Sequence, residues 1–242
     1  MQFFSYLING ISLGSVYALI ALGYTMVYGI AKMLNFAHGD VIMIGSYVVY
    51  FAFGASGLNP VLSIVLSMIV CTILGVVIER LAYRPLREAP SLAVLITAIG
   101  VSYLLQQVAQ LSWSSNPKSF TSVVSGMKPV SLFGGQLTIS AETIVTIVAC
   151  VVIMVVLMWF VNYTPAGHAM LAVSEDRGAA QLMGVNVNGT ISLTFAIGSA
   201  LAAIAGALLC SSYPTLQPTT GAMPGIKAFV AAGFGGVCSP PP

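Results

Sequence analysis

Three polar residues, Asn35, His38 and Asp40, lie close together in the stretch KMLNFAHGD, between two long segments that carry no charge. Ionisable side chains at membrane depth are costly and usually functional, so these residues are candidates for lining or gating a transport pathway. An equally open interpretation is an interfacial loop in which Asp40 caps the following helix. One histidine and one aspartate are too few ligands for a metal site, and we predict none.

Two glutamines, Gln106 and Gln107, are further candidates for the pathway. They lie in the apolar run 91–113, and Gln110 follows them at helical spacing. Inside a membrane, amide side chains either bond to neighbouring helices or line a water-filled path. Both roles remain open for these three glutamines.

The segment Gly10-Ile11-Ser12-Leu13-Gly14 matches the G-x-S-x-G pattern of hydrolase nucleophiles. That chemistry requires a turn between a strand and a helix, with a base within reach, and an apolar membrane helix supplies neither. The two glycines also form a G-x-x-x-G pair, which permits close helix packing in lipid. We therefore predict no catalytic residue, no enzymatic activity and no cofactor.

The composition identifies an integral membrane protein. Of the 242 residues, 58% are hydrophobic and 6% charged, and the mean hydropathy is +0.98. An ordinary soluble domain is about one-quarter charged. Because several uncharged runs exceed the roughly 20 residues of a membrane helix and do not alternate as barrel strands do, the fold class is all-α and polytopic. The net charge of +2 gives no indication of nucleic acid, and membrane lipid is the expected surroundings.

The uncharged runs predict about six to seven transmembrane helices in a single transmembrane domain, residues 1–242. Pro60 and the residues before it divide the run 41–78 into two spans. Three arginines in the segment 79–88 mark it as cytoplasmic by the positive-inside rule, where they act as topology anchors. Alternation then gives an external N-terminus, an external loop 114–140 and a cytoplasmic loop 163–189. The last run, 228–237, is too short to cross, which predicts a re-entrant piece or a truncated C-terminus.

A polar island, residues 165–188, lies within the predicted cytoplasmic loop. Its consecutive charges Glu175, Asp176 and Arg177 cannot all face lipid on one helix. Pro165 ends the preceding span, and residues 169–183 are good helix formers. The island is therefore predicted to be a short exposed helix on the aqueous side.

Five motifs are spread along the chain. In chain order they are NFAHGD with MIGSY at 35–47, ER with YRPLR at 79–87, AV through MGVN at 172–186, GSALA at 198–202, and GIKAF at 225–229. Together they resemble one family, the membrane permease subunits of bacterial ATP-binding cassette (ABC) importers for branched-chain amino acids. The resemblance covers nearly the whole chain.

The resemblance implies a multi-subunit importer in the bacterial inner membrane. Two permease subunits, a related pair or two copies of this chain, would form the pathway. Two cytoplasmic ATPase subunits would supply energy, and a periplasmic or extracellular binding protein would deliver substrate. The chain carries no G-x-x-x-x-G-K-[ST] phosphate loop, which agrees with a separate ATPase.

The resemblance also assigns the island as the coupling helix that docks on the ATPase. The family pattern E-A-A-x-x-x-G falls on Ala179, Ala180 and Gly184. Gly178 stands where the family has glutamate, so Glu175 or Asp176 would take over the charged role.

Two alternative functions stay open. A related ABC permease for urea or short amides would carry the same motifs. In an ion-coupled secondary carrier, by contrast, His38 and Asp40 would relay protons. Uptake that requires ATP and a partner ATPase separates the ABC permeases from the carrier.

Overall fold

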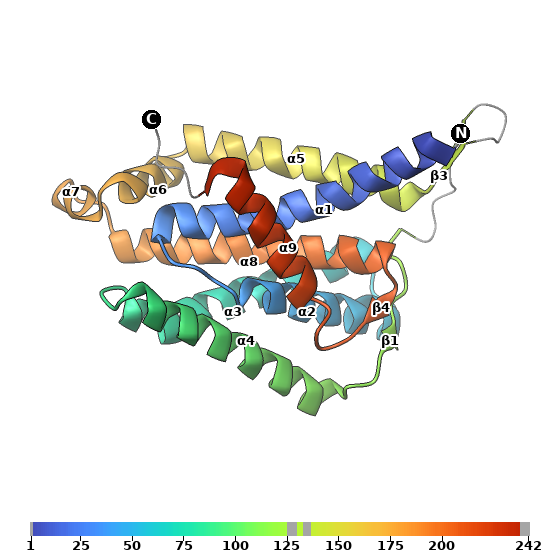
Figure 1. Ribbon diagram of the computed structural model, residues 1–242, viewed down its shortest axis with the longest axis horizontal. Helices are drawn as coiled ribbons and strands as arrows, with labels where there is room; N and C mark the ends of the chain where they lie inside the picture. Colours follow the sequence, from blue (N-terminus) through green and yellow to red (C-terminus); the bar gives the residue numbers. More distant parts are fainter. Residues whose placement is uncertain (1, 125–129, 133–136, 238–242) are drawn as a thin grey trace.

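Five helices of the computed structural model, which describes residues 2–124, 130–132 and 137–237, are long and apolar enough to cross a membrane. They run along the long axis of the molecule, as Figure 1 shows. The prediction of an all-α polytopic membrane fold is confirmed. These helices are α1 (Gln2–Ala31), α3 (Pro60–Ile78), α4 (Ser91–Trp113), α5 (Ala141–Tyr163) and α8 (Val187–Ser212).

The other two predicted apolar segments form shorter helices, so the described residues contain five candidate spans rather than six to seven. Helix α2 (His38–Val49) begins inside the polar stretch and continues into a π-helical turn, η1 (Tyr50–Ala55). Ten of the 12 residues of α2 are buried, because α3, α8 and α9 (Ala222–Ala232) surround it. A helix enclosed in this way has little surface left for lipid.

Helix α8 is the most buried of the five, and α1, α2 and α3 all pack against it. Small residues make this possible. A Cβ on Gly206 would lie 2.5 Å from the Ile42 carbonyl oxygen, and one on Gly198 would lie 3.2 Å from Val27. The pair Gly10 and Gly14 has no such neighbour within 4 Å, so it forms no close packing seam inside this chain.

Short strands support the connections at the opposite end from the polar island. Strand β1 (Lys118–Ser119) pairs antiparallel with β4 (Thr215–Leu216), and β2 (Val130–Leu132) pairs with β3 (Leu137–Ile139). Parts of the predicted external loop 114–140 and the whole segment 238–242 lie outside the described residues.

Helix α9 follows β4 and crosses α1 and α2 at a steep angle (Figure 1). The crossing is very close where Gly221 meets Gly39: a Cβ on Gly221 would lie 1.7 Å from the Gly39 carbonyl oxygen. A further π-helical turn, η5 (Gly233–Val237), continues α9.

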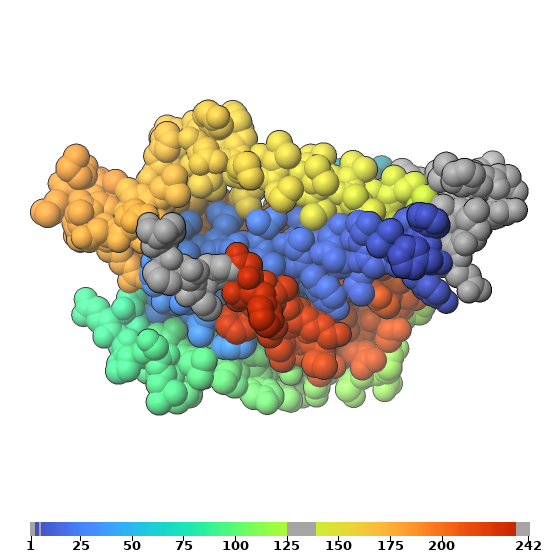
Figure 2. Space-filling view, turned by 45° about the horizontal axis from the view of Figure 1, so that its top comes forward, coloured from blue at the N-terminus to red at the C-terminus, as the bar shows by residue number. Residues whose placement is uncertain are grey.

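The polar island forms two helices, α6 (Pro165–Glu175) and α7 (Arg177–Leu182), rather than the single helix predicted over 169–183. The break lies at Asp176, whose extended backbone lets its carboxylate accept hydrogen bonds from the amides of Gly178 (2.7 Å) and Ala179 (3.1 Å). Figures 1 and 2 show α7 projecting beyond the ends of the long helices, with α6 connecting it to them. The turns η2 (Glu79–Tyr83) and η3 (Arg84–Leu86) lie near the same end.

Candidate functional site

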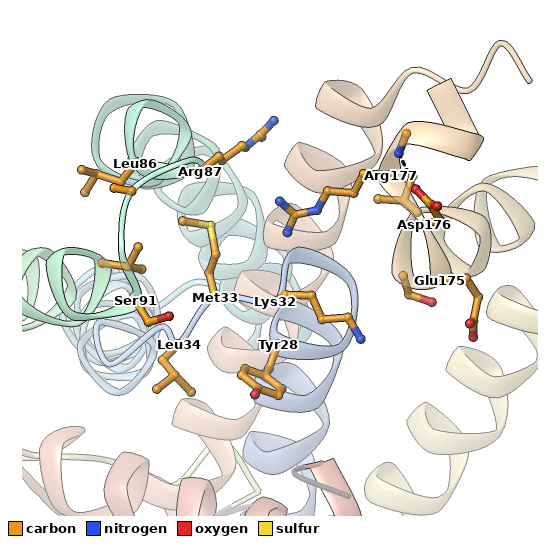
Figure 3. Close-up of a pocket in the computed structure, with 15 residues that line it drawn as sticks. Tyr28, Lys32, Met33, Leu34, Leu86, Arg87, Ser91, Glu175, Asp176 and Arg177 are labelled. Carbon is orange, nitrogen blue, oxygen red and sulfur yellow. Dashed lines mark hydrogen bonds between the residues drawn. The ribbon is translucent and has the colours of Figure 1, made fainter. Parts of the chain in front are cut away.

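A cavity of about 560 Å³ lies where the polar island meets the ends of the long helices. Its walls come from the end of α1, the loop before α4, and α6 with α7 (Figure 3). The charged residues among those that line it are Lys32, Arg87, Glu175, Asp176 and Arg177. The segment 79–88 and the polar island, far apart in sequence, therefore both contribute to one site.

A buried ion pair between Arg87 and Glu79 lies at one wall of this cavity. The carboxylate of Glu79, which is fully buried, accepts hydrogen bonds from Arg87 and from the Ser192 hydroxyl (2.6 Å). Arg87 also donates to the Asn188 side chain. These contacts connect the end of α3, the loop before α4 and the beginning of α8.

The predicted role of the three arginines as topology anchors is therefore incomplete. Arg80 and Arg84 are exposed, as an anchor at the membrane surface would be. Arg87 instead turns inward to Glu79, and its side chain is 13% exposed.

Arg177 forms the connection between α7 and the spans. Its guanidinium donates a hydrogen bond to the Ala31 carbonyl at the end of α1. Burial lowers the pKa of Arg177, and the nearby positive charge of Arg87 lowers that pKa further. Figure 3 shows Arg177 pointing into the cavity, whereas Glu175 points away from it.

The predicted coupling residues do not all face the same way. Glu175, Asp176, Ala179 and Gly184 are exposed, but Ala180 is buried against the chain's own core. Asp176 has a structural task as the cap of α7.

Sequence reasoning missed Leu182 and Met183, which are 90% and 84% exposed at the tip of α7. The available signal was an apolar pair, Leu182 and Met183, between the charged residues 175–177 and Gly184. Gly184 ends the helix with a φ of +86°, a conformation that suits glycine.

The structure brings two of the predicted pathway residues, Gln106 and Asp40, into contact, whereas Asn35 bonds to a residue that was not predicted. Gln106 donates to the Asp40 carboxylate at 2.8 Å, and Asn35 accepts from the Tyr83 hydroxyl at 2.8 Å. Gln107 is exposed and does not join them.

His38 is buried beneath α1. Its ring lies 4.6 Å from that of Tyr24, and a Cβ on Gly23 would come within 2.6 Å of it. Within the described residues, the Nε2 atom of His38 has no hydrogen-bond partner, and no group of three metal-ligating side chains is found.

We expect Gln106→Leu to destabilise the protein by about 1–3 kcal/mol, because it leaves the buried Asp40 carboxylate without this donor. Thermal unfolding in detergent would measure the loss. Gln107→Leu is the matched control, since it makes the same change one position away at an exposed site. Equal stability of the two variants would show that the bond between Gln106 and Asp40 contributes little.

Comparisons with known proteins agree with this architecture. Residues 6–242 match the family described as the permease component of branched-chain amino acid transport systems. The chain is 43% identical to the high-affinity branched-chain amino acid permease protein BraD of Pseudomonas aeruginosa, over 97% of this chain and 80% of that one. It is 41% identical to the corresponding protein LivH of Salmonella typhimurium, over 100% of this chain and 81% of that one.

More distant similarity extends to sugar transport. The ribose import permease protein RbsC of Haemophilus influenzae is 27% identical over 92% of this chain and 66% of its own length. No solved structure matches the chain. The extent of the family match, together with relatives above 40% identity, shows that this chain belongs to the family of permease components of branched-chain amino acid transport systems.

Proposed function

We propose that this chain is the permease subunit of an ABC importer that carries branched-chain amino acids across the inner membrane. The names of the relatives above 40% identity favour this substrate class over urea or short amides. They also favour the ABC importer over a carrier that works alone. The remaining subunits are a second permease, related or identical, two ATPases and a substrate-binding protein.

The observation that carries this proposal is the apolar tip of α7. Leu182 and Met183 are the two most exposed large hydrophobic residues of the polar island, and α7 projects beyond the long helices; adjacent exposed apolar side chains there are suited to an interaction site. A groove on the ATPase that covers them would bury this surface. Helices α6 and α7 together then act as the coupling element on the cytoplasmic side.

The contacts of α7 explain how a movement there would reach the pathway. Arg177 attaches α7 to the end of α1, and the chain continues from there through Lys32 to Asn35 and then to Asp40 at the start of α2. Displacement of α7 by the ATPase would therefore act directly on the segment that contains the pathway residues.

The double variant Leu182→Asp with Met183→Asp tests the proposal. We expect recovery of the ATPase with the purified permease to fall by about tenfold or more, because the variant places two charges in an apolar contact. Gln181→Asp is the control, since it adds a charge to an exposed polar position of the same helix. Undiminished ATPase recovery in the double variant would remove α7 from the interface.

Gly184→Trp is a less specific test of the same interface. At a φ of +86° any side chain strains the turn, so its effect would combine strain with added bulk.

A further inference from the structure

We propose that the cavity between Lys32, Arg87 and Arg177 receives an acidic side chain of the ATPase subunit. This inference rests on the proposed function, because it names the chemistry by which the ATPase would hold the permease beside α7. The apolar tip of α7 would supply one part of the interface, and this carboxylate would supply the other.

The arrangement of the charges around the cavity, rather than their sum, supports an incoming anion. Among the described residues, the pair of Arg87 with Glu79 is the only salt bridge, so Lys32 and Arg177 face the cavity without a carboxylate partner. The two acidic residues of the wall do not fill this role. Asp176 caps α7, and Glu175 is exposed and points away.

Arg177 provides hydrogen-bond donors to the cavity, and Arg87 adds positive charge beside it. The two terminal nitrogens of Arg87 already donate to Glu79 and Asn188. Arg177 lies near enough to Arg87 for the two positive charges to interact, which lowers the pKa of Arg177. A carboxylate beside Arg177 would relieve this repulsion and accept charge-assisted hydrogen bonds from its guanidinium group.

The position of the cavity favours a protein carboxylate over a lipid phosphate. Residues 173–178 of α6 and α7 form one wall, and α7 extends past the ends of the long helices, so an ATPase seated on α7 would lie beside this wall. Lys32, at the end of α1, is exposed and can meet such a partner.

Zero-length cross-linking of the reconstituted importer in nanodiscs tests the contact. A water-soluble carbodiimide activates a carboxylate, and the amine of Lys32 then displaces the urea by-product to form an amide. We expect mass spectrometry to find Lys32 joined to an aspartate or glutamate of the ATPase. The product should vanish without the ATPase and in Lys32→Arg, which keeps the charge but lacks the amine. Links from Lys32 to Glu175 or Asp176 alone would overturn the proposal.

Affinity measurements give an independent readout. We expect Lys32→Gln to weaken ATPase binding by about tenfold and to reduce its salt dependence, because it removes one charge of the contact. Lys32→Arg should bind like the native chain. Arg84→Gln is the matched control, since it removes a positive charge near the same end at an exposed position outside the cavity.

The outcomes separate this inference from the proposed function. If the native permease binds no ATPase, both fail. If the α7 variant weakens binding while Lys32→Gln behaves like Arg84→Gln, only the cavity proposal fails. If Lys32→Gln loses bound phosphatidylglycerol with ATPase affinity unchanged, the cavity takes a lipid phosphate, and the proposal is overturned.

Discussion

Glu79→Ala is expected to destabilise the protein by about 3–5 kcal/mol, because it removes the acidic partner of a buried ion pair. Glu79 is 0% exposed, and its two carboxylate oxygens accept from Arg87 and Ser192. The variant would leave the charge of Arg87 enclosed, with the Asn188 side-chain oxygen as its one remaining hydrogen-bond partner among the described residues. Thermal unfolding of the purified chain in detergent would measure the effect.

Two further variants make this prediction specific. Removing both charges with Glu79→Leu and Arg87→Leu should give a more stable protein than Glu79→Ala, because no unpaired charge remains. Arg80→Ala, at an exposed position of the same turn, should change stability little. A loss of less than about 1 kcal/mol in Glu79→Ala would contradict the buried character of the pair, since that is the size typical of exposed pairs.

Gly221→Ala is expected to disrupt the crossing of α9 over α2. The new Cβ would lie 1.7 Å from the Gly39 carbonyl oxygen and 2.7 Å from its carbon, both backbone atoms of a buried helix. Overpacking of this kind costs about 1–3 kcal/mol or more. Because Gly39 lies between His38 and Asp40, we also expect loss of leucine uptake by proteoliposomes that contain the complete importer.

Gly233→Ala is the control for this variant. Gly233 follows the end of the same helix, and no atom lies within 4 Å of a Cβ placed there. We expect near-native stability and uptake. Equal behaviour of the two variants would show that α9 shifts freely over α2.

The sequence by itself determined the class of fold and the positions of the long helices. The predicted run 91–113 is α4 itself. These features are predictable because hydropathy and the length of an apolar run are local properties of the sequence, and the thickness of the bilayer sets the values that a spanning helix must have. The family motifs were equally visible, since they lie along the chain.

One local feature could have been predicted and was missed. Asp176 is a good N-cap residue with a glycine two positions later, which is enough to indicate the break between α6 and α7. The helix-forming residues on both sides of it suggested one continuous helix instead.

Only the tertiary structure decided which polar groups meet. Gln106 and Asp40 are 66 residues apart, and Arg177 and Ala31 are 146 apart. The composition indicates that a buried charge in this apolar chain needs a polar or oppositely charged partner, but several side chains in the sequence could be that partner. The choice depends on how the helices pack around α8, because that packing places Arg87 against Glu79 and leaves Lys32 and Arg177 facing the cavity.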